Sequence, residues 1–150
     1  MRFNQFCEVL LTILSSRRAQ ALSLSKGGWE GWLQCELWNA VGDAGTTIER
    51  ERKYPGYNQF CDLVCVLDLS EHWIEIKAFG QFQEAKARVF LDTFANDVLK
   101  LEGAPKDAQK IAALIVSNNI GGSLIEMVKS RWGGVQILMT NSMTIFLVRF

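Results

Sequence analysis

The sequence predicts an α/β fold in which helices flank a mixed central sheet. First, segments with helical and with strand periodicity alternate along the 150 residues. Second, two extended segments, 62–69 and 72–79, are separated by only two residues, a spacing typical of an antiparallel hairpin within a sheet. Third, a hydrophobic content of 49% with 21% charged residues is ordinary for a chain that forms one domain with a buried core.

Two helices are expected in the N-terminal part. In residues 3–14 apolar side chains recur at steps of three and four, which indicates an amphipathic helix with one apolar stripe. A stretch rich in Ser and Gly, 23–28, precedes a second helix that runs from residue 29 to 41 and ends at Gly42. Residues 1–27 are therefore predicted to be an added helix and a linker, with the stripe packed on the body of the protein, on a partner or on a second copy.

The alternation continues to the C-terminus. The expected elements are strands over 46–53, 62–69 and 72–79, a helix over 83–101, a strand over 111–117, a helix over 123–132 capped by Ser123, and one or two strands over 135–150. Residues 28–117 thus give the order helix, three strands, helix, strand. Residues 118–150 add a helix and a strand or hairpin.

Composition limits the classes of function only loosely. Sixteen basic residues balance sixteen acidic ones, so contact with nucleic acid would require a local basic patch. Four cysteines without a CxxC pair and one histidine are too few for a zinc site, and we expect reduced thiols and a cytoplasmic location, although the cysteines of a secreted chain could pair. No run approaches the roughly 20 apolar residues of a membrane-spanning helix, and the N-terminus does not match a signal peptide, so no membrane contact is expected.

One pattern of charged residues indicates chemistry. Because side chains alternate along a strand, Glu75 and Lys77 are expected to project from one face while Ile74 and Ile76 bury the other. Hairpin pairing can bring Asp62 beside Glu75. Such carboxylates suit Mg²⁺ or Mn²⁺, which prefer oxygen ligands and keep positions for water and phosphate. An ammonium nearby would stabilise the negative charge that develops in phosphodiester cleavage.

Asp62, a spacer and Glu75-Ile76-Lys77 between apolar strand residues resemble the signature of the PD-(D/E)XK nuclease superfamily. Cys61 stands where the signature has proline, which lowers the specificity of the match. The order of elements over 28–117 also resembles that of the superfamily. The resemblance implies a restriction-endonuclease-like αβββαβ core and a magnesium-dependent endonuclease that cleaves DNA, with Asp62 and Glu75 as metal ligands and Lys77 as a catalytic residue.

The resemblance further implies an acidic residue on the first core helix that completes the metal site. Glu30 and Glu36 are the candidates, and Glu30 is favoured because it stands in the first turn, about three turns before Gly42. The run from Trp29 to Leu37 is also similar to nuclease domains of bacterial toxin systems. We therefore expect Glu30, Asp62, Glu75 and Lys77 to form the catalytic group.

Other residues are candidates for substrate contact. They are Gln81, Lys53, Lys86 and Lys100. Asp97 and Lys100 either match a recurrent pattern on the helix after the nuclease strands or form an ordinary ion pair at three-residue spacing. Two alternatives to a deoxyribonuclease remain: an RNase that uses the same site, and a noncatalytic binding or immunity-type module that retains the fold.

Overall fold

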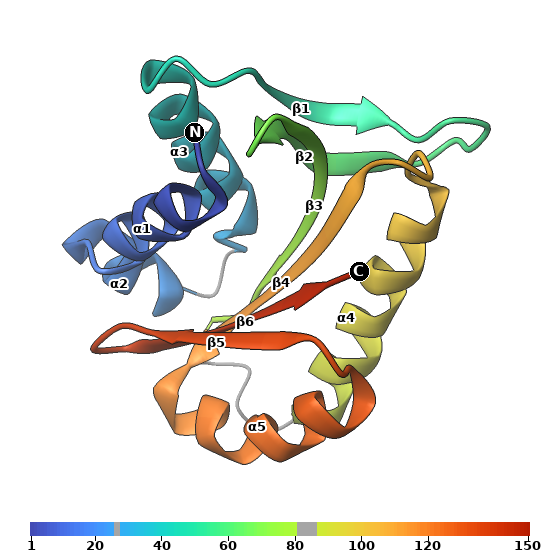
Figure 1. Ribbon diagram of the computed structural model, residues 1–150. Helices are drawn as coiled ribbons and strands as arrows, with labels where there is room; N and C mark the ends of the chain where they lie inside the picture. The colour runs from blue at the N-terminus through green and yellow to red at the C-terminus, as the bar shows by residue number, and fades with distance from the viewer. Residues whose placement is uncertain (26–27, 81–86) are drawn as a thin grey trace.

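Six strands form one mixed sheet with helices on both faces in the computed structural model, which describes residues 1–25, 28–80 and 87–150 (Figure 1). In chain order the elements are α1 (Phe3–Leu14), α2 (Arg17–Ser23), α3 (Glu30–Asp43), β1 (Ile48–Lys53), β2 (Phe60–Leu67), β3 (Ser70–Ala78), α4 (Ala87–Lys100), the 3-10 turn η2 (Leu101–Gly103), β4 (Gln109–Ser117), α5 (Asn118–Arg131), β5 (Val135–Met139) and β6 (Met143–Arg149). The strand order is β1-β2-β3-β4-β6-β5. Among the strands that the structure describes, only β3 and β4 are parallel neighbours. The predicted α/β class, with a mixed sheet flanked by helices, is confirmed.

The two faces of the sheet are covered by different helices. Figure 1 shows α1, α2 and α3 on one side and α4 and α5 on the other. Leu33 of α3 packs with Ile74 of β3 in one core, whereas Phe94 of α4 packs with Trp73 in the second. Alternate residues of β3 therefore face opposite helical layers, and the odd-numbered positions that include Glu75 and Lys77 face α4.

A two-residue turn, Asp68-Leu69, joins β2 to β3. Both residues have positive φ, 49° and 66°, as in the type I′ turn that matches the twist of a hairpin. The ladder closes at the pair Leu67↔Ser70. The predicted hairpin is confirmed, but its turn lies two residues before the expected Ser70-Glu71. The sequence carries no Asn-Gly or Asp-Gly signal here, and a leucine at positive φ is uncommon.

The N-terminal helix packs on the body of the protein. Phe6, Leu10 and Leu14 of its apolar stripe are buried in the core beneath α1. The predicted packing of this stripe on the body of the protein is therefore observed. The expected linker is partly helical, because residues 17–23 form α2. Ser16 begins this helix by accepting a hydrogen bond from the Ala19 amide at 3.1 Å.

The C-terminal helix begins earlier than predicted. Ser117 is the N-terminal capping position of α5, and Ser123 instead lies inside the helix, where its hydroxyl donates to the Ile120 carbonyl. The helix lies so close to β6 that a Cβ on Gly121 would overlap the Thr144 side chain. The segment after it forms a hairpin of β5 and β6, which is the two-strand alternative of the prediction.

The four cysteines are free thiols, and Cys7, Cys61 and Cys65 are buried. Within the described ranges, none of the helices combines the length and the apolar character that crossing a bilayer requires. Burial of three of the four thiols is typical of free cysteine, which packs like a small apolar side chain.

Candidate functional site

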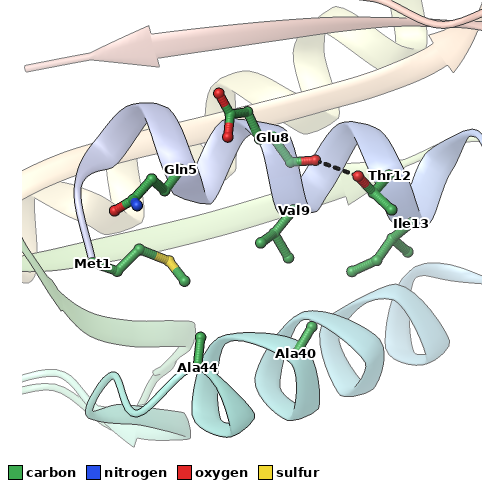
Figure 2. A pocket seen from close by; sticks show the side chains of 8 residues that line it. All are labelled: Met1, Gln5, Glu8, Val9, Thr12, Ile13, Ala40 and Ala44. Carbon is green, nitrogen blue, oxygen red and sulfur yellow. Dashed lines mark hydrogen bonds between the residues drawn. The ribbon is translucent and has the colours of Figure 1, made fainter.

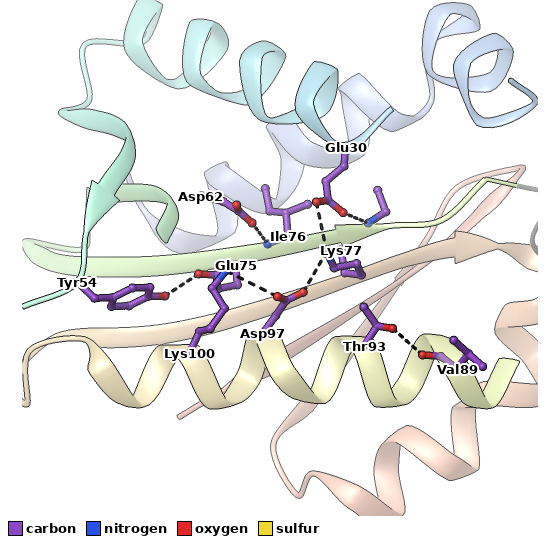
Figure 3. A network of polar contacts seen from close by, with 11 residues as sticks. Glu30, Tyr54, Asp62, Glu75, Ile76, Lys77, Val89, Thr93, Asp97 and Lys100 are labelled. Atoms are coloured by element: carbon purple, nitrogen blue, oxygen red, sulfur yellow. Dashed lines mark hydrogen bonds and ion pairs between the residues drawn. The ribbon is translucent and has the colours of Figure 1, made fainter. Parts of the chain in front are cut away.

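Charged side chains meet where β2 separates from β3 (Figure 3). The ladder between these strands ends at Ile74, while β2 stays paired with β1. Beyond that point β3 is no longer paired with β2, and two carboxylates accept hydrogen bonds from backbone amides on this edge of β3. Asp62 Oδ2 accepts from the Ile76 amide at 2.7 Å, and Glu30 Oε2 accepts from the Ala78 amide at 3.0 Å. Asp62 and the first turn of α3 are thereby fixed to the edge of β3.

Glu75 is held from both sides of the site. It is 1% exposed and lies between the end of β1 and the end of α4. Its Oε1 atom accepts a hydrogen bond from the Tyr54 hydroxyl at 2.7 Å. Its Oε2 atom accepts one from Lys100 Nζ, also at 2.7 Å. Both carboxylate oxygens are therefore engaged by side chains from other elements.

Lys77 lies between two carboxylates. Its Nζ atom is 3.3 Å from Glu30 Oε1 and 3.3 Å from Asp97 Oδ2. Asp97 also lies near the second lysine, because Lys100 Nζ is 3.7 Å from Asp97 Oδ1. Five residues are joined by these ion pairs, and Asp62 lies beside them on the Ile76 amide. We call these six residues the charged cluster: Glu30, Asp62, Glu75, Lys77, Asp97 and Lys100.

The charged cluster contains more carboxylates than ammonium groups. Burial raises the pKa of Glu30, Asp62 and Glu75 above the ordinary values, and the charge of Asp62 raises the pKa of Glu30 and Glu75 further. At Glu75 these effects outweigh the hydrogen bonds from Lys100 and Tyr54 and raise the pKa to about 7. Four carboxylates face two ammonium groups, so a divalent cation would relieve the repulsion among them.

Lys77 is held in its ammonium form. Burial lowers its pKa, but the carboxylates of Glu30 and Asp97 outweigh burial, and the pKa lies above the ordinary lysine value. A general base that works near neutral pH would need the opposite shift. The position therefore suits electrostatic stabilisation and the orientation of water, and it does not suit abstraction of a proton.

The chemistry of the donor set fits a hard divalent cation. Magnesium requires only one or two carboxylates, since water and substrate phosphate supply the other ligands. Asp62 and Glu75 are such a pair. In residues 1–25, 28–80 and 87–150, however, no three His, Cys, Asp or Glu side chains lie close enough together to hold one ion. The expected acidic trio is therefore not assembled as a metal site among these residues, and the two oxygens of Glu30 bind Lys77 and the Ala78 amide.

The two candidates for the acidic residue of the first core helix, Glu30 and Glu36, bind different partners. Glu30 reaches the charged cluster from the first turn of α3. Glu36, about two turns later, has a different partner, because its Oε1 atom lies 3.4 Å from Arg18 Nη1 of α2. The carboxylate that α3 contributes to this group is therefore Glu30.

The expected substrate-binding residues have different positions. Lys53 is exposed at the end of β1 and lies outside the charged cluster. Lys100, expected to contact substrate, instead binds the buried carboxylate of Glu75. Gln81 and Lys86 lie outside the described residues.

Two residues of the site, Tyr54 and Asp97, were not among the site residues predicted from the sequence. Tyr54 follows β1 directly, and its hydroxyl reaches Glu75 across 21 residues of sequence. For Asp97 the sequence left two readings open, a recurrent pattern shared with Lys100 on the helix after the nuclease strands and an ordinary ion pair at three-residue spacing. In the structure Asp97 is buried and lies beside both lysines.

A groove of about 650 Å³ lies between α1 and α3, apart from the charged cluster (Figure 2). Its lining consists of Met1, Gln5, Glu8, Val9, Thr12, Ile13, Ala40 and Ala44. Among the described residues that line it there is no Lys or Arg side chain to attract a phosphate. The groove therefore offers a poorer place for phosphodiester chemistry than the charged cluster does.

The charged cluster combines oxygen ligands for a cation with fixed ammonium groups, and it provides the basis for a functional assignment. A scan of protein-family models, a search of curated proteins and a search of solved structures found no match to this chain.

Proposed function

We propose that the protein is a metal-dependent nuclease that hydrolyses phosphodiester bonds, with DNA as the expected substrate. The observation that carries the proposal is the charged cluster itself. In it the carboxylates of Asp62 and Glu75 interact with each other, Lys100 binds Glu75, and Lys77 lies between Glu30 and Asp97. The order from α3 to β4, helix, three strands, helix, strand, supports a restriction-endonuclease-like core over residues 28–117. The preference for DNA rests on the resemblance of Asp62 and Glu75-Ile76-Lys77 to the PD-(D/E)XK signature.

Asp62 and Glu75 would hold Mg²⁺ or Mn²⁺. When bound, the cation would neutralise phosphate charge and lower the pKa of a bound water. Lys77 would place a fixed positive charge beside the scissile phosphate and hydrogen-bond its oxygens or the attacking water. Glu30 and Asp97 fix that ammonium from two elements, so its position costs little reorganisation when charge develops on the phosphate.

Tyr54 and the backbone hold the carboxylates in place. The Tyr54 hydroxyl fixes Glu75 Oε1, and the Ile76 amide fixes Asp62 Oδ2. The second oxygen of each carboxylate is the one that can turn toward a cation. Without a cation the excess of carboxylates repels a phosphodiester, so we expect substrate binding as well as cleavage to depend on the metal.

The direct test is incubation of the purified protein with plasmid DNA and, separately, with RNA, in Mg²⁺ or in EDTA. We expect cleavage of DNA in Mg²⁺ only, and a loss of about 100-fold or more in rate for Lys77→Met, as is typical when a group that stabilises the transition state is removed. Lys129→Met, which removes the same charge from an exposed position on α5, should cut at the wild-type rate.

The outcomes separate the alternatives. Cleavage of RNA alone, with the same dependence on Lys77, would identify an RNase that uses this site. Absence of cleavage of either polymer by the wild-type protein, with no difference from Lys77→Met, would refute the enzyme and leave a noncatalytic binding module.

A further inference from the structure

The two lysines of the charged cluster are bound in different ways. Lys77 lies at equal distances of 3.3 Å from Glu30 and Asp97. Lys100 lies 2.7 Å from Glu75 Oε2 and 3.7 Å from Asp97 Oδ1. Lys77 is thus shared between two carboxylates. Lys100 has one close partner and a second carboxylate within reach.

The two oxygens of Glu75 differ in what holds them. Oε1 is bound by Tyr54, which is 1% exposed and whose ring centroid lies 5.0 Å from that of Trp73, so this partner is fixed by packing. Oε2 is bound by Lys100, the last residue of α4, whose side chain is 26% exposed. A long side chain at a helix end can rotate away, whereas the packed tyrosine cannot. Oε2 is therefore the oxygen that a cation can take.

We propose, on the basis of the proposed function, that Lys100 is a positioning residue that occupies the place of the divalent cation on Glu75 and moves to Asp97 when the cation binds. The acceptor for this movement is already present at 3.7 Å. In the metal-free protein the ammonium keeps Glu75 from being a buried charge without a partner, which would be strongly destabilising. In the metal-bound protein the same ammonium stays beside the site.

If this exchange occurs, removal of Lys100 should improve one measurable property, cation binding, and impair another, the rate of cleavage. A cation must break the contact between Lys100 and Glu75 before it binds Oε2, so removal of Lys100 should tighten cation binding. The ammonium that moves to Asp97 remains close to the phosphate, so its removal should slow cleavage. A lysine that served only to support the fold would weaken both properties when replaced.

The test is a calorimetric titration of Mn²⁺ into wild type, Lys100→Met and the control Lys129→Met. We expect Lys100→Met to lower Kd by about tenfold or more, the value of a charge-assisted hydrogen bond that no longer has to be broken. Lys129→Met removes an exposed charge on α5, which contributes no residue to the charged cluster, and should change Kd by less than about threefold, as expected for a screened surface charge. An affinity of Lys100→Met no tighter than that of Lys129→Met would overturn the exchange.

A second measurement uses the wild-type protein alone, in case Lys100→Met does not fold. The NMR signal of the Lys100 Cε methylene, assigned with Lys100→Arg, should move on titration with Mg²⁺ while that of Lys129 stays in place. An unmoved Lys100 signal at saturating Mg²⁺ would overturn the exchange and leave the nuclease intact. Failure of the wild-type protein both to bind Mn²⁺ and to cut nucleic acid would instead refute the proposed function, and the exchange with it.

Discussion

Replacing Glu75 by Gln should stabilise the metal-free protein above neutral pH. The ordinary pKa of this carboxyl is 4.5, and in the folded protein it is raised to about 7, first by burial and then by the charge of Asp62. Between these values the folded state binds more protons than the unfolded state. The free energy of unfolding of the wild type therefore falls as the pH rises from about 4.5 to about 7, and the loss is complete above that range.

The size of the effect follows from the shift. At about 1.4 kcal/mol per pKa unit, the displacement from 4.5 to about 7 corresponds to about 3 kcal/mol. Glutamine has the shape of glutamate and can still accept from Tyr54, but it has no charge to bury. Lys100, deprived of Glu75, keeps Asp97 as a partner. We expect Glu75→Gln to be more stable than the wild type by about 3 kcal/mol at pH 8, and the advantage to disappear near pH 4.5.

The assay is urea denaturation of both proteins in EDTA at intervals from about pH 4.5 to 8.5, which spans the titration expected for this carboxyl. The difference between the two free energies isolates Glu75, because the titration of distant groups cancels. A difference that stays constant across this range would refute the argument. So would a Glu75→Gln protein that is less stable than the wild type at pH 8.

Tyr54→Phe removes a hydrogen bond that lowers the pKa of Glu75, so the fall in stability should move to higher pH, as measured by the same denaturation series; an unchanged midpoint would contradict this. Leu69→Gly should raise the stability by about 1 kcal/mol, because glycine adopts positive φ without steric cost; a loss of stability would show that the leucine side chain is needed. Gly121→Ala should lower the stability by about 1 to 3 kcal/mol, because the added methyl group overlaps Thr144; a neutral result in thermal unfolding would show that α5 can shift.

Local patterns were sufficient for part of the site. Strand alternation depends only on the period of the backbone, so the spacing of Glu75 and Lys77 placed both on one face whatever the fold around them. The apolar stripe of α1 was equally clear, and its bounds agree with the predicted range of 3–14. These features are properties of single elements.

Contacts between elements were harder to foresee. Lys100 meets Glu75 across 25 residues of sequence, and Glu30 meets the Ala78 amide across 48. Such contacts depend on where one element lies relative to another, and the chain carries no local signal for that placement. The partners of Glu30 likewise come from a distant element, because the ammonium and the amide that it binds belong to β3.

The carboxylates at the end of the β2 and β3 ladder have a consequence for solubility. An open strand edge with free amides is a template on which another chain can add a strand, and such edges promote aggregation. Asp62 and Glu30 accept hydrogen bonds from the Ile76 and Ala78 amides at this edge. An incoming strand could not displace these anionic groups without burying their charge. The residues proposed to serve chemistry thus also protect the sheet against strand addition, and neutralising both would remove that protection together with the proposed activity.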